Sequence, residues 1–172
     1  TQEGIYQHFK AIQQSTDLPL IVYNIPGRCG VNILPETLMR IVELGNVVAV
    51  KEASASLDQI TEILKLAPKG FSLLSGDDNF MFSSMCLGGQ GVISVLANLL
   101  PKKVVSLYNL LANNNIVDAR FLHMELQPFF KALFVETNPQ PIKFLMNSSG
   151  LSVGNCRLPL CEMEVSNKNI LL

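Results

Sequence analysis

The stretch Val47-Val48-Ala49-Val50-Lys51-Glu52-Ala53-Ser54 decides the fold of this chain. Its four apolar residues are small or β-branched and follow Gly45-Asn46, so the pattern predicts a buried strand that runs into a loop. Lys51 then lies at the carboxyl end of the strand, where the catalytic groups of α/β folds collect. A poorly solvated lysine loses part of its preference for the charged form, and a neutral amine can attack a ketone to form a Schiff base. The alternative is a lysine that points into water, which is the commoner case for strand-end lysines.

The composition indicates a globular protein that binds small molecules and other copies of itself. The chain has 172 residues, enough for one domain with a hydrophobic core, and 48% of them are hydrophobic. Its net charge of -1 gives no electrostatic case for binding nucleic acid or an anionic membrane. No apolar run approaches the roughly 18 to 20 residues that span a bilayer. The amino-terminal segment is polar and lacks the features of a signal or transit peptide. We therefore expect a cytoplasmic protein.

The cysteines and histidines predict neither disulfides nor a metal site. The four cysteines show no C-x-x-C pairing, and a mid-sized intracellular chain keeps its thiols reduced. His8 and His123 are isolated and form no H-E-x-x-H or H-x-H arrangement, which makes a zinc site improbable.

Apolar spacing predicts a strand-loop-helix unit four times in the first hundred residues, after an opening helix over 4–14. The expected strands cover 18–23, 47–51, 71–75 and 92–95. The helices that follow them are expected at 35–44, at 57–67, after Asn79 as far as Met85 or Leu87, and at 97–100. Beyond Pro101 only helices are expected, over 101–112, 116–136 and 141–147, and residues 151–172 carry no clear pattern.

Repeated strand-helix units imply a parallel sheet with right-handed crossovers. Two architectures fit: an open doubly wound sheet, or part of a (β/α)8 TIM barrel, which normally takes about 250 residues. Short, regular units that each end in a functional-looking loop favour the barrel, although four strands cannot close one. We therefore expect residues 1–100 to form the second half of a (β/α)8 barrel and residues 101–172 to form a C-terminal helical domain and tail. On this interpretation the chain is the carboxyl-terminal portion of a longer protein.

In such a barrel the carboxyl ends of the strands present Tyr23, Lys51, Gly76 and Ile93 around one mouth. Tyr23 is either a proton shuttle or an ordinary core aromatic, and its spacing alone favours the core. Arg28 lies in a glycine-flanked turn, where its guanidinium either binds a carboxylate through two hydrogen bonds or lies at the surface. Gly76 begins a Gly-Asp-Asp sequence that either lines the pocket or caps the next helix.

Two further motifs carry weaker signals. Asp77 and Asp78 would suit acid-base work or a metal, but neighbouring aspartates need not converge and no third ligand lies at helical spacing. Gly88-Gly89-Gln90-Gly91 lacks the lysine and the spacing of a phosphate-binding loop, so it predicts a tight turn.

Five motifs, in order, resemble the dihydrodipicolinate (4-hydroxy-tetrahydrodipicolinate) synthase family, within the N-acetylneuraminate lyase superfamily of class I aldolases. The motifs are Tyr23-Asn24-Ile25-Pro26-Gly27-Arg28-x-Gly30, Lys51-Glu52-Ala53, Ser75-Gly76-Asp77-Asp78, Gly88-Gly89-x-Gly91-Val92-Ile93-Ser94 and Asn138-Pro139-x-Pro141-x-Lys143. Any one of them would be weak evidence alone. Their order and spacing over nearly the whole chain make the resemblance specific.

The resemblance implies a (β/α)8 barrel with a carboxyl-terminal helical domain, commonly assembled as a homotetramer. It implies that Lys51 forms a Schiff base with pyruvate and that the resulting enamine adds to aspartate semialdehyde, the first committed step of lysine and diaminopimelate biosynthesis. Tyr23 would be the proton relay, Arg28 would bind the carboxylate of the second substrate, and the backbone of Ile93 would contact the bound keto acid. No metal or organic cofactor is implied.

The chain departs from the family pattern in two respects. Cys29 stands where the family usually has threonine. The paired threonines of the proton relay, a tyrosine lent by a neighbouring subunit and most of the lysine feedback site belong to a part of the barrel that this sequence lacks. We therefore expect this chain alone to have only part of the active site.

Other functions stay open at this stage. One is another pyruvate-dependent aldolase, such as N-acetylneuraminate lyase or a keto-deoxy-sugar-acid aldolase. Arg28 argues against the sialic acid enzymes, which generally lack an arginine there. The other is an inactive fragment that retains the fold, against which the presence of Tyr23, Arg28 and Lys51 argues.

Overall fold

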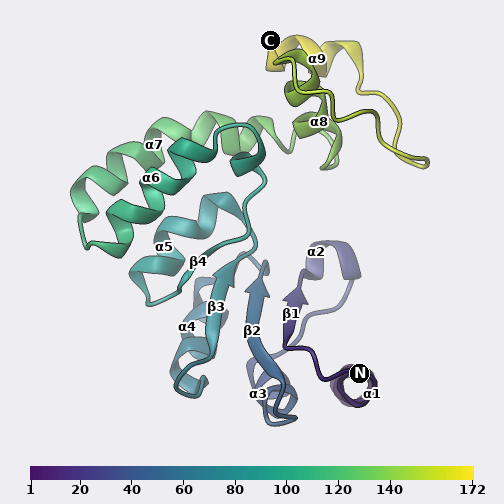
Figure 1. Cartoon of the computed structure of the whole chain (residues 1–172), viewed down its shortest axis with the longest axis vertical. Helices are drawn as coiled ribbons and strands as arrows, with labels where there is room; N and C mark the ends of the chain where they lie inside the picture. The colour runs from purple at the N-terminus through teal and green to yellow at the C-terminus, as the bar shows by residue number, and fades with distance from the viewer. The chain divides into compact units, whose positions relative to one another are not determined.

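The computed structural model describes residues 1–172 and divides into two compact units. The first unit is Thr1–Ile93 and the second is Ser94–Leu172. Figure 1 shows the elements of both.

The first unit contains a parallel sheet of four strands, which lie side by side in the order of the sequence (Figure 1). The strands are β1 (Leu20–Asn24), β2 (Val47–Glu52), β3 (Ser72–Ser75) and β4 (Gly91–Val92). Neighbouring strands are parallel throughout. A doubly wound sheet reverses its strand order at a switch point, whereas a barrel adds each strand beside the one before it. The consecutive order therefore fits part of a barrel.

Helices precede and connect these strands, and most of them lie where the apolar spacing predicts. They are α1 (Gln2–Gln14), α2 (Pro26–Cys29), α3 (Pro35–Val42), α4 (Leu57–Leu66) and α5 (Met81–Cys86), with a short 3₁₀ turn over Asp78–Phe80. Pro35 occupies the first turn of α3, where its missing N–H costs nothing. Ser56 caps α4 by accepting a hydrogen bond from the backbone N–H of Gln59.

The structure differs from the predicted elements at two places in this region. The segment after β1, predicted as a glycine-flanked turn, contains the short helix α2. The fourth strand was predicted over 92–95 but covers only Gly91–Val92. It ends early because the Ser94 hydroxyl accepts a hydrogen bond from the Ala97 backbone N–H and begins a 3₁₀ turn over Leu96–Asn98.

The core of the first unit lies between the sheet and helices α3 and α4. Val22, Val50 and Leu73 occupy the same register on three strands and are fully buried. Their partners on the helices are also buried: Leu38 and Ile41 of α3, and Ile60 and Ile63 of α4. The side chains that alternate with these on the strands point to the opposite face. There Ile21 is 52% exposed, so this second face of the sheet is open.

The second unit contains only helices. They are α6 (Pro101–Ala112), α7 (Ile116–Ala132), α8 (Gln140–Ser148) and α9 (Val165–Leu171), and α6 and α7 run side by side (Figure 1). The helix predicted over 116–136 ends at Ala132, and α9 was not predicted. The expectation that residues 101–172 form a separate C-terminal helical domain stays a prediction.

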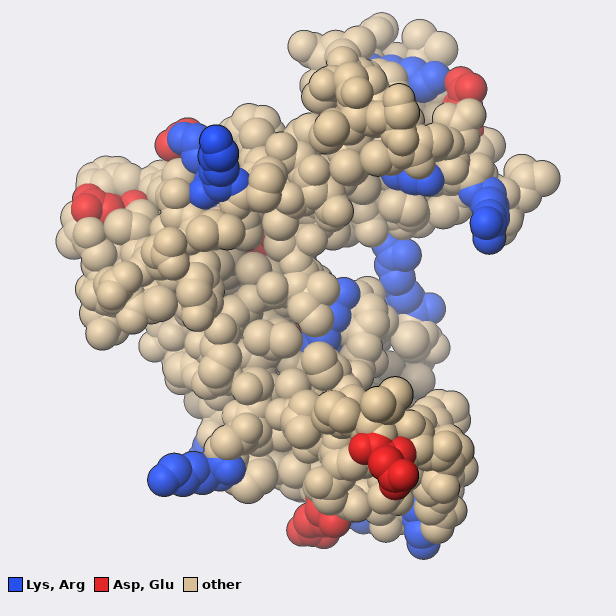
Figure 2. Space-filling model, in the orientation of Figure 1, with Lys and Arg blue, Asp and Glu red and all other residues tan.

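The surface shows no dominant charge. Figure 2 shows basic and acidic side chains scattered over the visible face, with no extended patch of either sign. All four cysteines are free thiols. No helix is both long enough and apolar enough to cross a bilayer.

Candidate functional site

The pairing of β1 with β2 brings Tyr23 and Lys51 together at the carboxyl ends of the two strands. The two residues are register partners in this parallel pair. The Nζ atom of Lys51 lies 3.9 Å from the centroid of the Tyr23 ring, in cation–π geometry. Tyr23 is 42% exposed and Lys51 is half-buried, so neither is the buried residue that a core role would require.

Gly76 holds the end of β3 against the Lys51 side chain. Its backbone N–H donates a hydrogen bond of 2.7 Å to the Glu52 carbonyl. A Cβ added at Gly76 would lie 2.7 Å from the Ala53 Cβ and 3.2 Å from the Lys51 Cγ, so no side chain fits there without movement. The sequence predicted Gly76 near the pocket, and the structure adds that a side chain at this position would press on the stem of Lys51.

Ile93 follows β4 and continues its pairing with β3. Its backbone N–H donates a hydrogen bond of 2.9 Å to the Ser75 carbonyl. The amide of Ile93 is therefore used within the sheet. The backbone carbonyl is the group of this residue that a ligand would meet, and it can only accept a hydrogen bond.

Arg28 lies in α2, the short helix that follows β1, and its side chain is exposed. Gly30 closes this turn in the left-handed conformation, with φ of 69°, and its N–H donates to the Pro26 carbonyl. Cys29, the departure from the family pattern, is exposed in the same turn. The structure thus places Tyr23, Lys51 and Gly76 close together, while Arg28 and Ile93 lie on the segments that follow β1 and β4.

The aspartate that directly follows Gly76 is a helix-capping residue. Asp77 caps the 3₁₀ turn through a 2.9 Å hydrogen bond from the Asn79 backbone N–H, as the capping alternative predicts. Burial raises the pKa of the Asp77 carboxyl, and the bond from Asn79 opposes that shift. No group of three or more His, Cys, Asp or Glu side chains has an arrangement that could hold a metal ion.

Sequence reasoning missed a buried polar network on the other side of the same strand ends. It consists of Asn24 at the end of β1, Glu52 at the end of β2, Asn32 in the loop before α3 and Gln59 in the first turn of α4. Asn24 and Glu52 are each 2% exposed. Each directly follows a candidate site residue, so the alternation of a strand points it away from the site. That alternation was the available signal.

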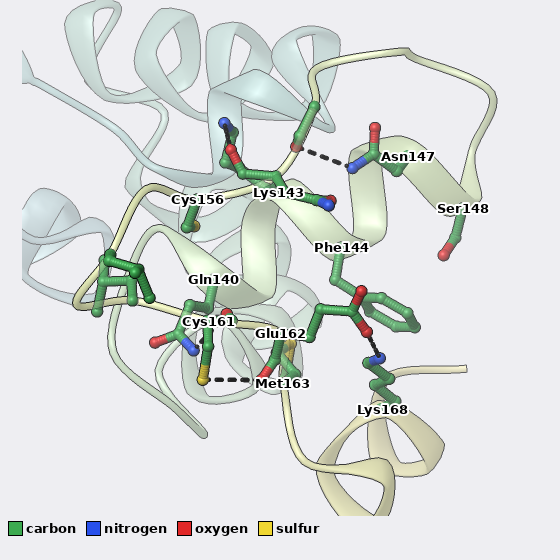
Figure 3. A pocket seen from close by; sticks show the side chains of 14 residues that line it. Gln140, Lys143, Phe144, Asn147, Ser148, Cys156, Cys161, Glu162, Met163 and Lys168 are labelled. Atoms are coloured by element: carbon green, nitrogen blue, oxygen red, sulfur yellow. Dashed lines mark hydrogen bonds and ion pairs between the residues drawn. The ribbon is translucent and has the colours of Figure 1, made fainter.

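Each unit has a hollow whose lining does not include Lys51. In the first unit, a groove of about 580 Å³ is lined by α1, the α2 turn and Tyr23. In the second unit, a hollow of about 570 Å³ lies between α8 and the carboxyl-terminal segment (Figure 3). Its lysines are engaged: Lys168 lies 3.0 Å from Glu162, as Figure 3 shows, and Lys143 donates to the Asn155 carbonyl. None of the candidate site residues lines this second hollow.

The sequence is similar to one family over nearly its whole length. Residues 1–171 match the model of the dihydrodipicolinate synthetase family. The 4-hydroxy-tetrahydrodipicolinate synthase of Desulforudis audaxviator is 46% identical over 171 residues, which cover 99% of this chain and 58% of that protein.

Solved structures show the same likeness. Dihydrodipicolinate synthase from Thermotoga maritima superposes with a TM-score of 0.95 at 46% identity, covering 99% of this chain and 59% of that one. The chloride-inhibited synthase of Acinetobacter baumannii, complexed with pyruvate, superposes with a TM-score of 0.95 at 34% identity over 99% of this chain and 59% of that one. The likeness agrees with part of an α/β barrel.

The chain spans somewhat more than half the length of these relatives, 58% in the first case and 59% in the structures. These shares state how much of each relative is matched and not which end of it. The expectation that this chain is the carboxyl-terminal portion of a longer protein therefore stays a prediction.

Proposed function

The chain belongs to the dihydrodipicolinate synthetase family, and from this premise we propose that it supplies the Schiff-base lysine of a 4-hydroxy-tetrahydrodipicolinate synthase. The reaction condenses pyruvate with aspartate semialdehyde. The observation that carries the proposal is the pairing of Lys51 with Tyr23, 3.9 Å from Nζ to ring centroid, at the carboxyl ends of neighbouring parallel strands. A relative that is 34% identical was solved in complex with pyruvate, which supports the choice of keto acid.

The proposed chemistry begins with the amine of Lys51. In its neutral form, Nζ attacks the ketone carbon of pyruvate, and the adduct takes up one proton and loses one water to leave a protonated Schiff base. A proton then leaves the methyl carbon to give an enamine, whose carbon forms a bond to the aldehyde carbon of aspartate semialdehyde while the aldehyde oxygen takes up a proton to become a hydroxyl. The amine of this second substrate attacks the imine carbon, which closes the ring and releases Lys51. Tyr23 carries protons between these steps through its phenol.

Two further residues have proposed contacts with substrate. The Arg28 guanidinium can hold the carboxylate of aspartate semialdehyde through two parallel hydrogen bonds. The Ile93 carbonyl is an acceptor, so it would pair with a donor such as the N–H of the Schiff base and not with the carboxylate of pyruvate. Gly76 lines the site and leaves room for the stem of Lys51. The proposal invokes no metal and no organic cofactor.

The second face of the sheet, which carries Ile21 and Tyr23, is open. This supports the proposal that the site is completed by residues outside this chain. Ile21 and Tyr23 are 52% and 42% exposed on that face, and an apolar face of this kind is buried in a closed barrel. We propose that the remaining barrel strands cover it in the complete protein, and that the complete protein assembles as a homotetramer. The chain alone would then have low activity or none.

The test compares substrate pairs with the complete protein that contains this chain. We expect a cyclised product from pyruvate and aspartate semialdehyde, and no turnover with pyruvate and N-acetylmannosamine. Arg28→Lys keeps the positive charge but loses the planar two-donor geometry, so it should raise KM for aspartate semialdehyde and leave KM for pyruvate unchanged.

The alternatives give different results. Turnover of the sugar with none of the semialdehyde would favour another aldolase of the superfamily. No turnover of either pair would favour an inactive protein that retains the fold.

A further inference from the structure

Glu52, the residue after Lys51, is a buried carboxylate without a cationic partner. It is 2% exposed, and no lysine, arginine or histidine forms an ion pair with it. Its oxygens accept hydrogen bonds from the Ser54 backbone N–H at 2.7 Å, from Asn24 Nδ2 at 3.0 and 3.2 Å and from Gln59 Nε2 at 3.1 Å. A buried charge is tolerated when hydrogen bonds satisfy it, and bonds to an ionised acceptor are the stronger kind.

The same network holds both ends of the segment that carries Arg28. Asn24 lies just before this segment, and its Nδ2 also donates to Asn32 Oδ1 at 2.8 Å. Asn24 Oδ1 accepts from the Ile33 backbone N–H at 3.0 Å, and Asn32 Nδ2 donates to Gln59 Oε1 at 2.7 Å. The turn with α2 therefore begins and ends on side chains that are bonded to Glu52 or to its partner Gln59.

The hydrogen bonds of Asn24 and Glu52 also fix the positions of Tyr23 and Lys51. Tyr23 and Lys51 precede Asn24 and Glu52 in their strands, so the bond between Asn24 and Glu52 lies directly behind the pair that faces the site. The Glu52 carbonyl also accepts the 2.7 Å hydrogen bond from Gly76, which borders the Lys51 stem. A shift of Glu52 would thus move three parts of the site at once.

We propose that Glu52 is a positioning residue, whose carboxylate sets the Lys51–Tyr23 pair and the Arg28 turn in their relative places. The inference rests on the proposed Schiff-base function of Lys51. The carboxylate is suited to this role because it is an acceptor only and every group bonded to it is a donor. Glutamine has nearly the same shape, but its amide would set an NH2 group against one of those donors.

The test measures the rate of pyruvate trapping by borohydride in the complete protein that contains this chain. Glu52→Gln should lower the rate constant for trapping by about 10- to 100-fold, because small misplacements of a reacting group cost about that much. The final trapped fraction should stay the same. Glu62→Gln makes the same chemical change on the exposed side of α4 and should leave the rate constant unchanged.

Two further variants separate positioning from a loss of folding. In the double variant Glu52→Gln/Gln59→Glu, the new carboxylate accepts from the new amide, whose own oxygen stays available to the Ser54 backbone N–H, but the amide nitrogen then faces Asn24 Nδ2, so the rate constant should recover only in part. Asn32→Ala frees the far end of the Arg28 turn but leaves every hydrogen bond to Glu52 in place, so it should raise KM for aspartate semialdehyde more than it lowers the trapping rate constant.

The outcomes distinguish the two proposals. If the unmodified protein traps no pyruvate, the proposed function is wrong. If it does, an unchanged rate constant in Glu52→Gln overturns the positioning role. A smaller trapped fraction with an unchanged rate constant also overturns it, since that result is expected of a residue that only supports folding. A rate constant in the double variant no higher than in Glu52→Gln would contradict the role of these hydrogen bonds.

Discussion

The two sides of strands β1 and β2 differ sharply at their carboxyl ends. On the side toward the helices, Asn24 and Glu52 are buried and every oxygen of the carboxylate is hydrogen-bonded. On the other side, Tyr23 and Lys51 touch each other but stay partly open to solvent. This chain therefore buries the polar network behind its candidate site and leaves the face that carries Tyr23 and Lys51 open to solvent.

The apolar residues of the sheet show the same contrast between its two faces. Leu73 is 1% exposed in the core against α3 and α4, and Ile21 is 52% exposed on the opposite face. Both are large aliphatic side chains on strands of one sheet. Burial, and not residue type, therefore sets what each contributes to stability.

The largest expected effect tests this contrast in the 172-residue chain. Leu73→Ala should lower the free energy of unfolding by about 2–5 kcal/mol, because it removes buried methyl groups and leaves a cavity. Ile21→Ala should cost less than about 1 kcal/mol, since much of that side chain is already in water. Urea titration of both variants measures the difference. Equal losses of unfolding free energy in the two variants would mean that the face that carries Ile21 is covered in this chain too.

A smaller effect on stability is expected at Gly76, which lies next to Glu52 and to the stem of Lys51. Gly76→Ala should destabilise the chain by about 1–3 kcal/mol, since its Cβ would press on Ala53 and on the Lys51 stem. Gly27→Ala is the matched control, because a Cβ there meets nothing within 4 Å. The backbone of neither glycine is left-handed, so the pair compares space alone. Similar unfolding free energies for the two variants would contradict the close contact at Gly76.

The smallest effect concerns Asp77, whose pKa is raised by burial. The stability that this shift contributes is fully present below the unfolded value of about 3.9 and is lost as pH rises through the higher native value. Asp77→Asn keeps an oxygen for the Asn79 N–H but does not titrate. The free energy of unfolding of the variant, relative to the unmodified chain, should therefore increase as pH rises from about 3 to about 7. A difference that is constant or decreases over this range, in urea titrations at each pH, would contradict the raised pKa.

Much of the first unit could be predicted from the sequence because its signals are local. The apolar run before Lys51 predicted β2, and apolar spacing predicted where α3 and α4 begin. The network around Glu52 depends on contacts that are distant in sequence: Asn24 lies 28 residues from Glu52. Strand alternation could have placed both residues on the helix side, but nothing in their local sequence shows that they meet. The fourth strand was overestimated because the Ser94 cap competes with strand pairing.

The roles of Lys51, Tyr23, Arg28, Ile93 and Gly76 were predicted through resemblance and stay predictions. The structure adds geometry for three of them, since Lys51 lies over Tyr23 and beside Gly76. The spacing of single residues could not have given this contact, because it depends on the register between β1 and β2.

Peptide mapping after borohydride reduction with pyruvate, in the complete protein that contains this chain, identifies the lysine that forms the Schiff base. We expect a 1-carboxyethyl group on Nζ of Lys51. Lys51→Arg should abolish the adduct, because a guanidinium stays protonated, and Lys65→Arg at the surface of α4 should leave it unchanged. An adduct on a different lysine, or none at all, would contradict the claim that Lys51 is the nucleophile.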